Sequence, residues 1–195
     1  MDDGSRAIFR GEKVWLRAYT QTDIDAYQRC VNDKDVAFWA GLGLPQSRER
    51  VAAVVERMTT EHGKEAYFVV CPLGSDEFIG TTWLWNRDAR GWGYPSIELS
   101  IFIGDTTRWG TGVGTDAVNA TVDAGFSNWD IRRIWLTTAT HNERSRRSFA
   151  KAGFVEEGVL RQAERQRGRV QDVTVMAILR SEWEALDRPK SWDFD

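Results

Sequence analysis

The chain has 195 residues, a formal net charge of −3 and 42% hydrophobic residues. This length suits one domain with a sizeable core and is marginal for two, so we expect a single domain over 1–195. The acidic balance argues against nucleic acid as a partner. The polar N-terminus resembles no secretory signal and no apolar run is long enough for a membrane span, so we expect a cytoplasmic protein without a membrane partner.

The cysteine and histidine patterns do not predict a metal site. Cys30 and Cys71 belong to no CxxC pair and lie in apolar surroundings, so we expect two buried free thiols and a reducing compartment. His62 and His141 are too far apart to form a recognisable metal pair, so we expect no bound metal.

The first half of the chain predicts a strand, two helices and three further strands. Residues 13–19 alternate apolar and polar side chains, which predicts a half-buried strand, and Thr20 or Thr22 can cap a helix that begins near Asp23. A break at 41–45 precedes a second helix over 48–62. Residues 66–71, 78–85 and 97–103 predict three consecutive antiparallel strands.

The second half predicts a helix from Val113 to between 125 and 128, a strand over 131–140 and a helix over 143–154 that Gly153 ends. Gly168 suits a hairpin turn before a final strand over 170–179. The tail over 187–195 lacks periodicity, and we expect it to be mobile or docked by Trp192. Together these elements predict one mixed α/β domain.

The stretch RWGTGVGTDA (108–117) places Gly110, Gly112 and Gly114 at alternate positions between a strand and a helix. The dinucleotide motif GxGxxG fails at Thr115, and the phosphate loop GxxxxGK[ST] fails because it needs a lysine. The third interpretation is an anion nest, in which backbone N–H groups and the helix dipole hold a pyrophosphate and Arg108 adds charge. The alternative is a tight turn without a ligand.

Four segments in order resemble the GNAT superfamily of N-acetyltransferases, within it the RimJ/RimL-type branch that includes spermidine acetyltransferases. They are RGEKVWLRAYTQTDIDAY, IGDTTRWGTGVGTDAV, THNERSRRSFAKAGFVEEG and QDVTVMAILRSEW. Trp109 stands at the branch's Gln/Arg position, and Gly112 and Gly114 are its two glycines. The resemblance covers a core of about 11–183, which leaves 184–195 as a C-terminal tail.

The resemblance implies a central, mostly antiparallel sheet that splays into a V between its fourth and fifth strands, flanked by about four helices. Acetyl-CoA would lie in this V as cosubstrate. Its pantetheine would pair with the strand edge formed by Ile101, Phe102 and Ile103. Its pyrophosphate would lie on the segment Arg108, Trp109, Gly110, Thr111, Gly112, Val113, Gly114 and Thr115.

The implied chemistry is attack of an amine on the acetyl thioester in a ternary complex. Amine acceptors are mostly protonated at neutral pH, so a base must take a proton. Glu98, at the start of the strand that enters the site, is the first candidate; a surface carboxylate or a cation-recognition group is the alternative. A backbone N–H of Phe102 or Ile103 would stabilise the oxyanion.

The helix over 143–154 would supply the remaining site residues. Asn142 would bond pantetheine or the opposing backbone and also cap this helix. Arg144, Arg147 and Lys151 have helical spacing and would face the 3′-phosphate of CoA, unless they form a solvated face. The position of the branch's acidic tyrosine holds Phe149, which cannot donate a proton.

Because of Phe149, Ser145 or Ser148 would orient a water for the leaving thiolate, or the thiolate would leave unassisted. Ser148 is otherwise a solvated helix residue. His141, next to Asn142, lies near the expected cleft and is a weaker candidate for a catalytic part.

Two functions remain open. The first is an acetyl-CoA-dependent N-acetyltransferase whose acceptor is a protein N-terminus, a polyamine or a small amine. The second is a catalytically weak module that binds or senses acyl-CoA. Acidic Asp23, Asp25, Asp33 and Asp35 would attract a cationic acceptor or form solvated helix ends, and Trp39, Trp83, Trp85 and Trp92 would wall its pocket. By analogy, a strand edge near 170–179 would pair two subunits as a homodimer.

Overall fold

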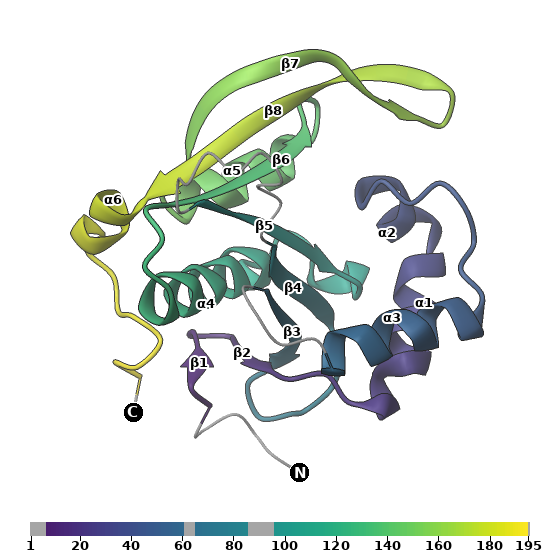
Figure 1. Ribbon diagram of the computed structural model, residues 1–195, viewed down its shortest axis with the longest axis horizontal. Helices are drawn as coiled ribbons and strands as arrows, with labels where there is room; N and C mark the ends of the chain where they lie inside the picture. The colour runs from purple at the N-terminus through teal and green to yellow at the C-terminus, as the bar shows by residue number, and fades with distance from the viewer. Residues whose placement is uncertain (1–6, 61–64, 86–95, 195) are drawn as a thin grey trace.

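One eight-stranded sheet runs through the protein, whose computed structural model describes residues 7–60, 65–85 and 96–194 (Figure 1). The strands are β1 (Phe9–Arg10), β2 (Val14–Arg17), β3 (Ala66–Pro72), β4 (Gly80–Trp85), β5 (Ser96–Ile103), β6 (Arg133–Ala139), β7 (Val155–Gln166) and β8 (Arg169–Leu179). Their order is β1-β2-β3-β4-β5-β6-β8-β7, and every neighbouring pair is antiparallel except β5 with β6. The predicted mostly antiparallel α/β sheet is confirmed.

The sheet opens where β5 and β6 part. These two strands pair in parallel only near their starts, from Ser96 with Arg133 to Glu98 with Trp135. Beyond this point β5 continues along β4 as far as Ile103, whereas β6 continues along β8. This is the expected V. It falls between the fifth and sixth strands because the two-residue strand β1 precedes the strand that the sequence indicates as the first.

Six α-helices flank the sheet within the described residues, so the expectation of about four is wrong. They are α1 (Ile24–Asn32), α2 (Lys34–Trp39), α3 (Arg48–Thr60), α4 (Val113–Asn128), α5 (Glu143–Lys151) and α6 (Arg180–Ala185). The additional helices, α2 and α6, have six residues each, too few to show a helical period. Asp33 ends α1 and also caps α2, since its carboxylate accepts hydrogen bonds from the N–H groups of Asp35 and Val36.

The helices cover both faces of the sheet (Figure 1). Val14 and Leu16 of β2 pack with the α4 side chains, whereas Trp15 packs with side chains of α1 and α3. The expectation of a half-buried strand is therefore wrong, because all three residues are buried. The alternation of side chains still divides the strand between two cores.

A long hairpin, β7–β8, arches over the far end of the sheet (Figure 1). Its two-residue turn has positive φ at Arg167 (46°) and Gly168 (77°), the geometry of a type I′ turn, and so confirms the predicted hairpin. β8 lies between β6 and β7, so the expected exposed edge near 170–179 is wrong. The outer strand is β7, because β8 already pairs with β6 along Val173–Leu179.

The C-terminal tail docks against α4 through Asp123. This buried carboxylate accepts hydrogen bonds from the indole of Trp183, the guanidinium of Arg188 and both the N–H and the hydroxyl of Ser191. Trp192, the residue expected to dock the tail, is 51% exposed and contacts only the edge of Trp183 among the ring pairs described.

Three global expectations concern thiols, membranes and metals. Both cysteines are free; Cys71 is buried as expected, whereas Cys30 is only partly buried. Among the described helices, none combines the length and apolar character needed to cross a bilayer. No group of three His, Cys, Asp or Glu side chains in the described ranges is arranged to hold a metal ion.

Candidate active site

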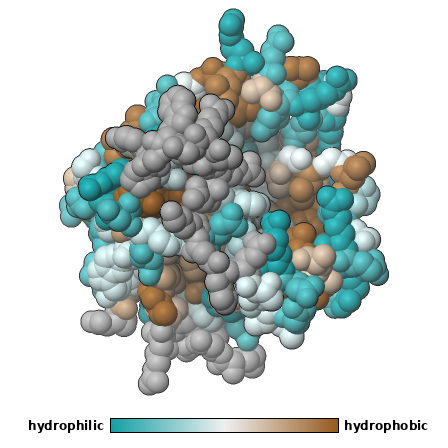
Figure 2. Space-filling model, in the orientation of Figure 1, coloured by the Kyte–Doolittle hydropathy of each residue, from teal (hydrophilic) through white to brown (hydrophobic). Residues whose placement is uncertain are grey.

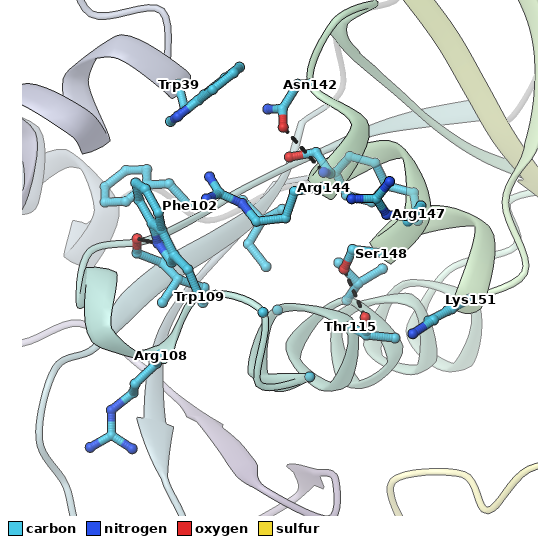
Figure 3. A pocket seen from close by; sticks show the side chains of 18 of the residues that line it. Trp39, Phe102, Arg108, Trp109, Thr115, Asn142, Arg144, Arg147, Ser148 and Lys151 are labelled. Atoms are coloured by element: carbon cyan, nitrogen blue, oxygen red, sulfur yellow. Dashed lines mark hydrogen bonds between the residues drawn. The ribbon is translucent and has the colours of Figure 1, made fainter.

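A cavity of about 350 Å³ lies in the V, between the end of β5, the N-terminus of α4, α5 and α2 (Figure 3). Most of the predicted catalytic and CoA-binding residues line it: Ile101, Phe102, Ile103, Arg108, Trp109, Gly110, Gly112, Gly114, Thr115, Asn142, Arg144, Arg147, Ser148 and Lys151. Three predicted residues are not among its lining. Val113 points into the core, Thr111 turns to Lys13, and Glu98 lies further back along β5.

The glycine loop forms the floor of the cavity. Gly110 and Gly112 have φ of +79° and +92°, a left-handed conformation that costs other residues energy. The first helical hydrogen bond of α4 runs from Asp116 N–H to the Gly112 carbonyl. The N–H groups of the preceding residues have no partner within the helix and carry the positive end of its dipole. Such a loop is suited to an anionic group.

Trp109 joins this loop to the open edge of β5. Its indole N–H donates to the Ile103 carbonyl at 2.8 Å, which engages one acceptor of the edge predicted to pair with pantetheine. The Arg144 guanidinium lies over the Trp109 ring, 3.9 Å from its centre, and 5.7 Å from that of Trp39. Arg144 therefore crosses the cavity from α5 toward the loop (Figure 3). Burial lowers the pKa of this guanidinium, which nevertheless stays charged at neutral pH.

The cavity lining is cationic. It contains four arginine or lysine side chains and, among the described lining residues, no carboxylate. Arg108 is one of the four, but its guanidinium bonds Asp105 at 2.8 Å, lies 3.6 Å from Glu77 and points away from the other labelled residues (Figure 3), so its charge is largely offset. Arg147 bonds Glu143 in an exposed pair that contributes little. Arg144 and Lys151 are therefore the main cationic groups.

Helix α5 and its N-cap place three of the residues that the sequence analysis singled out. Asn142 caps the helix by accepting the Ser145 N–H, as predicted, and its buried side chain lines the cavity. Ser148 bonds the hydroxyl of Thr115 at 2.8 Å, beside Gly114 (Figure 3). Phe149 is buried against Phe154. Ser148 thus lies at the anion end of the cavity, next to the glycine loop.

Glu98 lies at the point where the V opens, opposite Trp85 on β4 and Trp135 on β6. Its side chain is 7% exposed. Because alternate residues of a strand share a face, Glu98 lies on the same face as Phe102, and Ile97 and Leu99 face α4. The carboxylate therefore belongs to the side of the sheet that α1 and α3 cover.

The expected tryptophan wall is placed in part. Trp83 and Trp85 pack edge to face on the Glu98 side, with ring centres 5.8 Å apart. Trp39 lines the cavity from α2 and lies 5.4 Å from the ring of His141. Trp92 and His62 lie outside the described residues.

Asp23 and Asp25 pair with arginines, and Asp33 caps α2, so these three act as helix-end residues.

Two parts of the site have no counterpart in the sequence-based predictions. Val36 and Ala40 line the cavity from α2, a helix too short to predict. Lys13, about 100 residues before the glycine loop, bonds the Thr111 carbonyl. The local pattern around Lys13 predicts only a strand, and it carries no signal of a contact so distant in the chain.

A model of the family described as "Acetyltransferase (GNAT) domain" matches residues 13–155. The chain belongs to this family. It is also 26% identical over 175 residues to the uncharacterised N-acetyltransferase YoaA of Bacillus subtilis, covering 89% of this chain and 97% of that protein. Over 88 residues it is 33% identical to the spermidine N(1)-acetyltransferase of Vibrio cholerae, covering 45% and 50% of the two chains.

Solved structures agree with this assignment. The spermidine N-acetyltransferase of Vibrio cholerae in complex with CoA and spermine superposes with a TM-score of 0.77 at 25% identity, over 88% of this chain and 98% of that chain. Mycobacterium smegmatis RimJ, in complex with CoA-disulfide, shares the fold with a TM-score of 0.75 at 23% identity, over 92% and 87%. The predicted family and its branch are confirmed, and the enzyme is an N-acetyltransferase.

Proposed function

We propose that the enzyme transfers the acetyl group of acetyl-CoA to a primary amine by direct attack within a ternary complex. The observation that carries this proposal is the cavity itself. A glycine loop at a helix N-terminus forms its floor, cations line it, and it opens beside the edge of β5 that β6 no longer pairs with after Glu98. These features fit an extended donor with a phosphate end and a thioester end.

The residues of the cavity divide between these two ends. The N–H groups of Gly112 to Thr115, with Lys151 and Arg144, would hold the phosphates. The open edge at Ile101 and Phe102 would pair with the pantetheine arm, since strand edges offer unpaired backbone groups. Arg108 keeps a place in this proposal only through its backbone, because its side chain is engaged by Asp105.

Ser148 belongs with the phosphate end in this arrangement. Its bond to Thr115 and its proximity to Gly114 support contact with the pyrophosphate rather than the predicted role of orienting a water for the leaving thiolate. With Phe149 in place of tyrosine, the thiolate leaves unassisted or through water. A thiol with a pKa near 8.5 is a fair leaving group.

Glu98 is our proposed base, acting directly or through water. Its support is its position: Glu98 is buried, lies where β5 and β6 part, and shares a face of the sheet with Phe102, Trp83 and Trp85. Glu98→Gln preserves size while removing the basic oxygen. We expect kcat/KM to fall at least tenfold at neutral pH, and unchanged activity would remove Glu98 from the mechanism.

Two assays together determine whether the enzyme binds CoA and which class of amine accepts the acetyl group. Thermal shift with CoA tests donor binding, and thiol release from acetyl-CoA against peptides with free N-termini, polyamines and small amines tests transfer. The polyamine acetyltransferase relatives support including spermidine. Stabilisation by CoA without thiol release for any amine would favour the sensor module that Phe149 leaves open. No stabilisation by CoA would contradict both functions.

We also propose that the enzyme forms a homodimer through β7. This outer strand is exposed along its length, and Val155, Val159 and Leu160 are exposed apolar residues on it. Figure 2 shows hydrophobic residues among hydrophilic ones at the top of the molecule, where the hairpin lies in Figure 1. A long exposed edge of this kind is a template for pairing with another chain. Sedimentation of the wild type and of Leu160→Lys measures this, and a monomeric wild type at micromolar concentration would contradict it.

A further inference from the structure

The segment before β2 wraps around the first turn of α4, although the two are about 100 residues apart in sequence. The Asp116 carboxylate accepts hydrogen bonds from the backbone N–H groups of Glu12, Lys13 and Val14. Gly11 makes this approach possible, because a Cβ there would lie 2.2 Å from an Asp116 oxygen. The backbone of Lys13 is thus fixed relative to the glycine loop.

The side chain of Lys13 then reaches the loop. Its ammonium donates to the Thr111 carbonyl at 2.6 Å, a charge-assisted bond. A Cβ on Gly112 would lie 3.0 Å from the same nitrogen, so the ammonium packs directly against the left-handed residue that precedes α4. The Thr111 carbonyl is therefore directed to Lys13, and neither of these two residues lines the cavity in the V.

This orientation matters because a peptide unit points its C=O and its N–H in opposite directions. With the Thr111 carbonyl bonded to Lys13, the N–H of Gly112 is directed to the other side of the loop. A flipped peptide would instead present a carbonyl oxygen to an incoming phosphate, which is repulsive. Lys13 thus stabilises the arrangement that suits an anion.

The charge of Lys13 has a second consequence. The first turn of α4 carries the Asp116 carboxylate, which would repel a phosphate bound at this helix end. The Lys13 ammonium lies on the same turn and offsets that charge. A second cavity lined by Lys13 adjoins the first, and the two share Gly112, Thr115 and Lys151.

We propose that Lys13 is a positioning residue for the phosphate end of CoA: it fixes the peptide at Thr111–Gly112 and supplies positive charge beside the glycine loop. The inference rests on the proposed use of CoA as donor. It predicts that Lys13 affects binding of the phosphates and leaves the transfer step, which takes place at the other end of the cavity, almost unchanged.

The test is calorimetric titration of CoA into the full chain as wild type, Lys13→Met, Lys13→Arg and Lys34→Met. Lys34, the first residue of α2, is exposed like Lys13 but lines neither cavity, so it serves as the matched control. We expect Lys13→Met to weaken CoA binding about tenfold, and Lys13→Arg and Lys34→Met to stay within about threefold of the wild type.

Steady-state kinetics with two donors separate positioning from damage to the fold. Acetyl-CoA and S-acetylpantetheine carry the same thioester, but only the former has the pyrophosphate and 3′-phosphate. For Lys13→Met we expect KM for acetyl-CoA to rise about tenfold with kcat little changed, and kcat/KM for S-acetylpantetheine to stay within about twofold.

Three outcomes would overturn the inference. The first is CoA affinity of Lys13→Met within twofold of the wild type. The second is an equal loss with both donors. The third concerns Lys13→Arg, which keeps the charge and the donor and replaces Lys13→Met as the test if Lys13→Met does not fold. If Lys13→Arg binds CoA more than tenfold more weakly than the wild type, the inference is wrong. A wild type that binds no CoA contradicts the proposed function itself, and is therefore a distinguishable failure.

Discussion

Replacing Gly112 by alanine tests the glycine loop most directly. Gly112 has φ of +92°, where a residue with a Cβ pays about 1–2 kcal/mol. Gly168, in the turn of the β7–β8 hairpin, has φ of +77°, and a Cβ there would meet nothing within 4 Å. Gly168→Ala therefore carries a similar backbone cost at a residue that lines neither cavity, and it is the matched control.

The two variants should differ in what the added Cβ touches. At Gly112 it would approach the Lys13 ammonium to 3.0 Å, and the flexible lysine would give way. That movement weakens the 2.6 Å bond to the Thr111 carbonyl. An exposed charge-assisted bond is worth about 1.4 kcal/mol, which equals about tenfold in a dissociation constant.

Both quantities are measurable on the same samples. In a domain of this size about 2–4 °C of Tm corresponds to 1 kcal/mol, so both variants should lose about 2–8 °C in the absence of ligand. In calorimetric titrations, Gly112→Ala should bind CoA at least tenfold more weakly and Gly168→Ala within twofold of the wild type. Wild-type affinity in Gly112→Ala, alongside the expected loss of Tm, would refute the loop as the phosphate site.

Three further predictions concern stability and thiol reactivity. Asp123→Ala leaves the Arg188 guanidinium without its buried partner and should cost about 3–5 kcal/mol, with the C-terminal tail becoming cleavable by proteases; a tail as resistant as in the wild type would contradict its docking role. Burial alone would raise the pKa of Asp23, but hydrogen bonds from Arg17 and Thr20 lower it below its usual value. A lowered folded pKa contributes stability above the unfolded value near 3.9 that is lost as pH falls, so the difference in Tm between wild type and Arg17→Met should be large at pH 7 and shrink toward pH 3. A difference independent of pH would argue against this pair. Burial raises the pKa of Cys30 and of Cys71 to about 11, so iodoacetamide at pH 8 should label the folded protein much more slowly than the unfolded chain; equal rates would contradict their burial.

The errors of sequence-based prediction fall where the signal is short or nonlocal. Helices α2 and α6 have six residues each, less than two turns, so no apolar period develops. The strand 170–179 was expected at an edge because order along the chain does not determine order in the sheet, and β7 takes that place. Arg108 is predicted to contribute charge, but its guanidinium pairs with the carboxylates of Asp105 and Glu77, and the local sequence does not signal the second of these contacts.

The sequence by itself determined the features that depend on local spacing. Alternation predicted the strands, the glycines at 110, 112 and 114 predicted an anion-binding loop at a helix N-terminus, and four motifs in order identified the family. Tertiary structure alone decided how distant segments meet. It brought Lys13 to Thr111, Asp123 to the tail and Ser148 to Thr115, and it opened the sheet after Glu98. These contacts join residues at least 33 positions apart, and a local pattern carries no signal for such pairs.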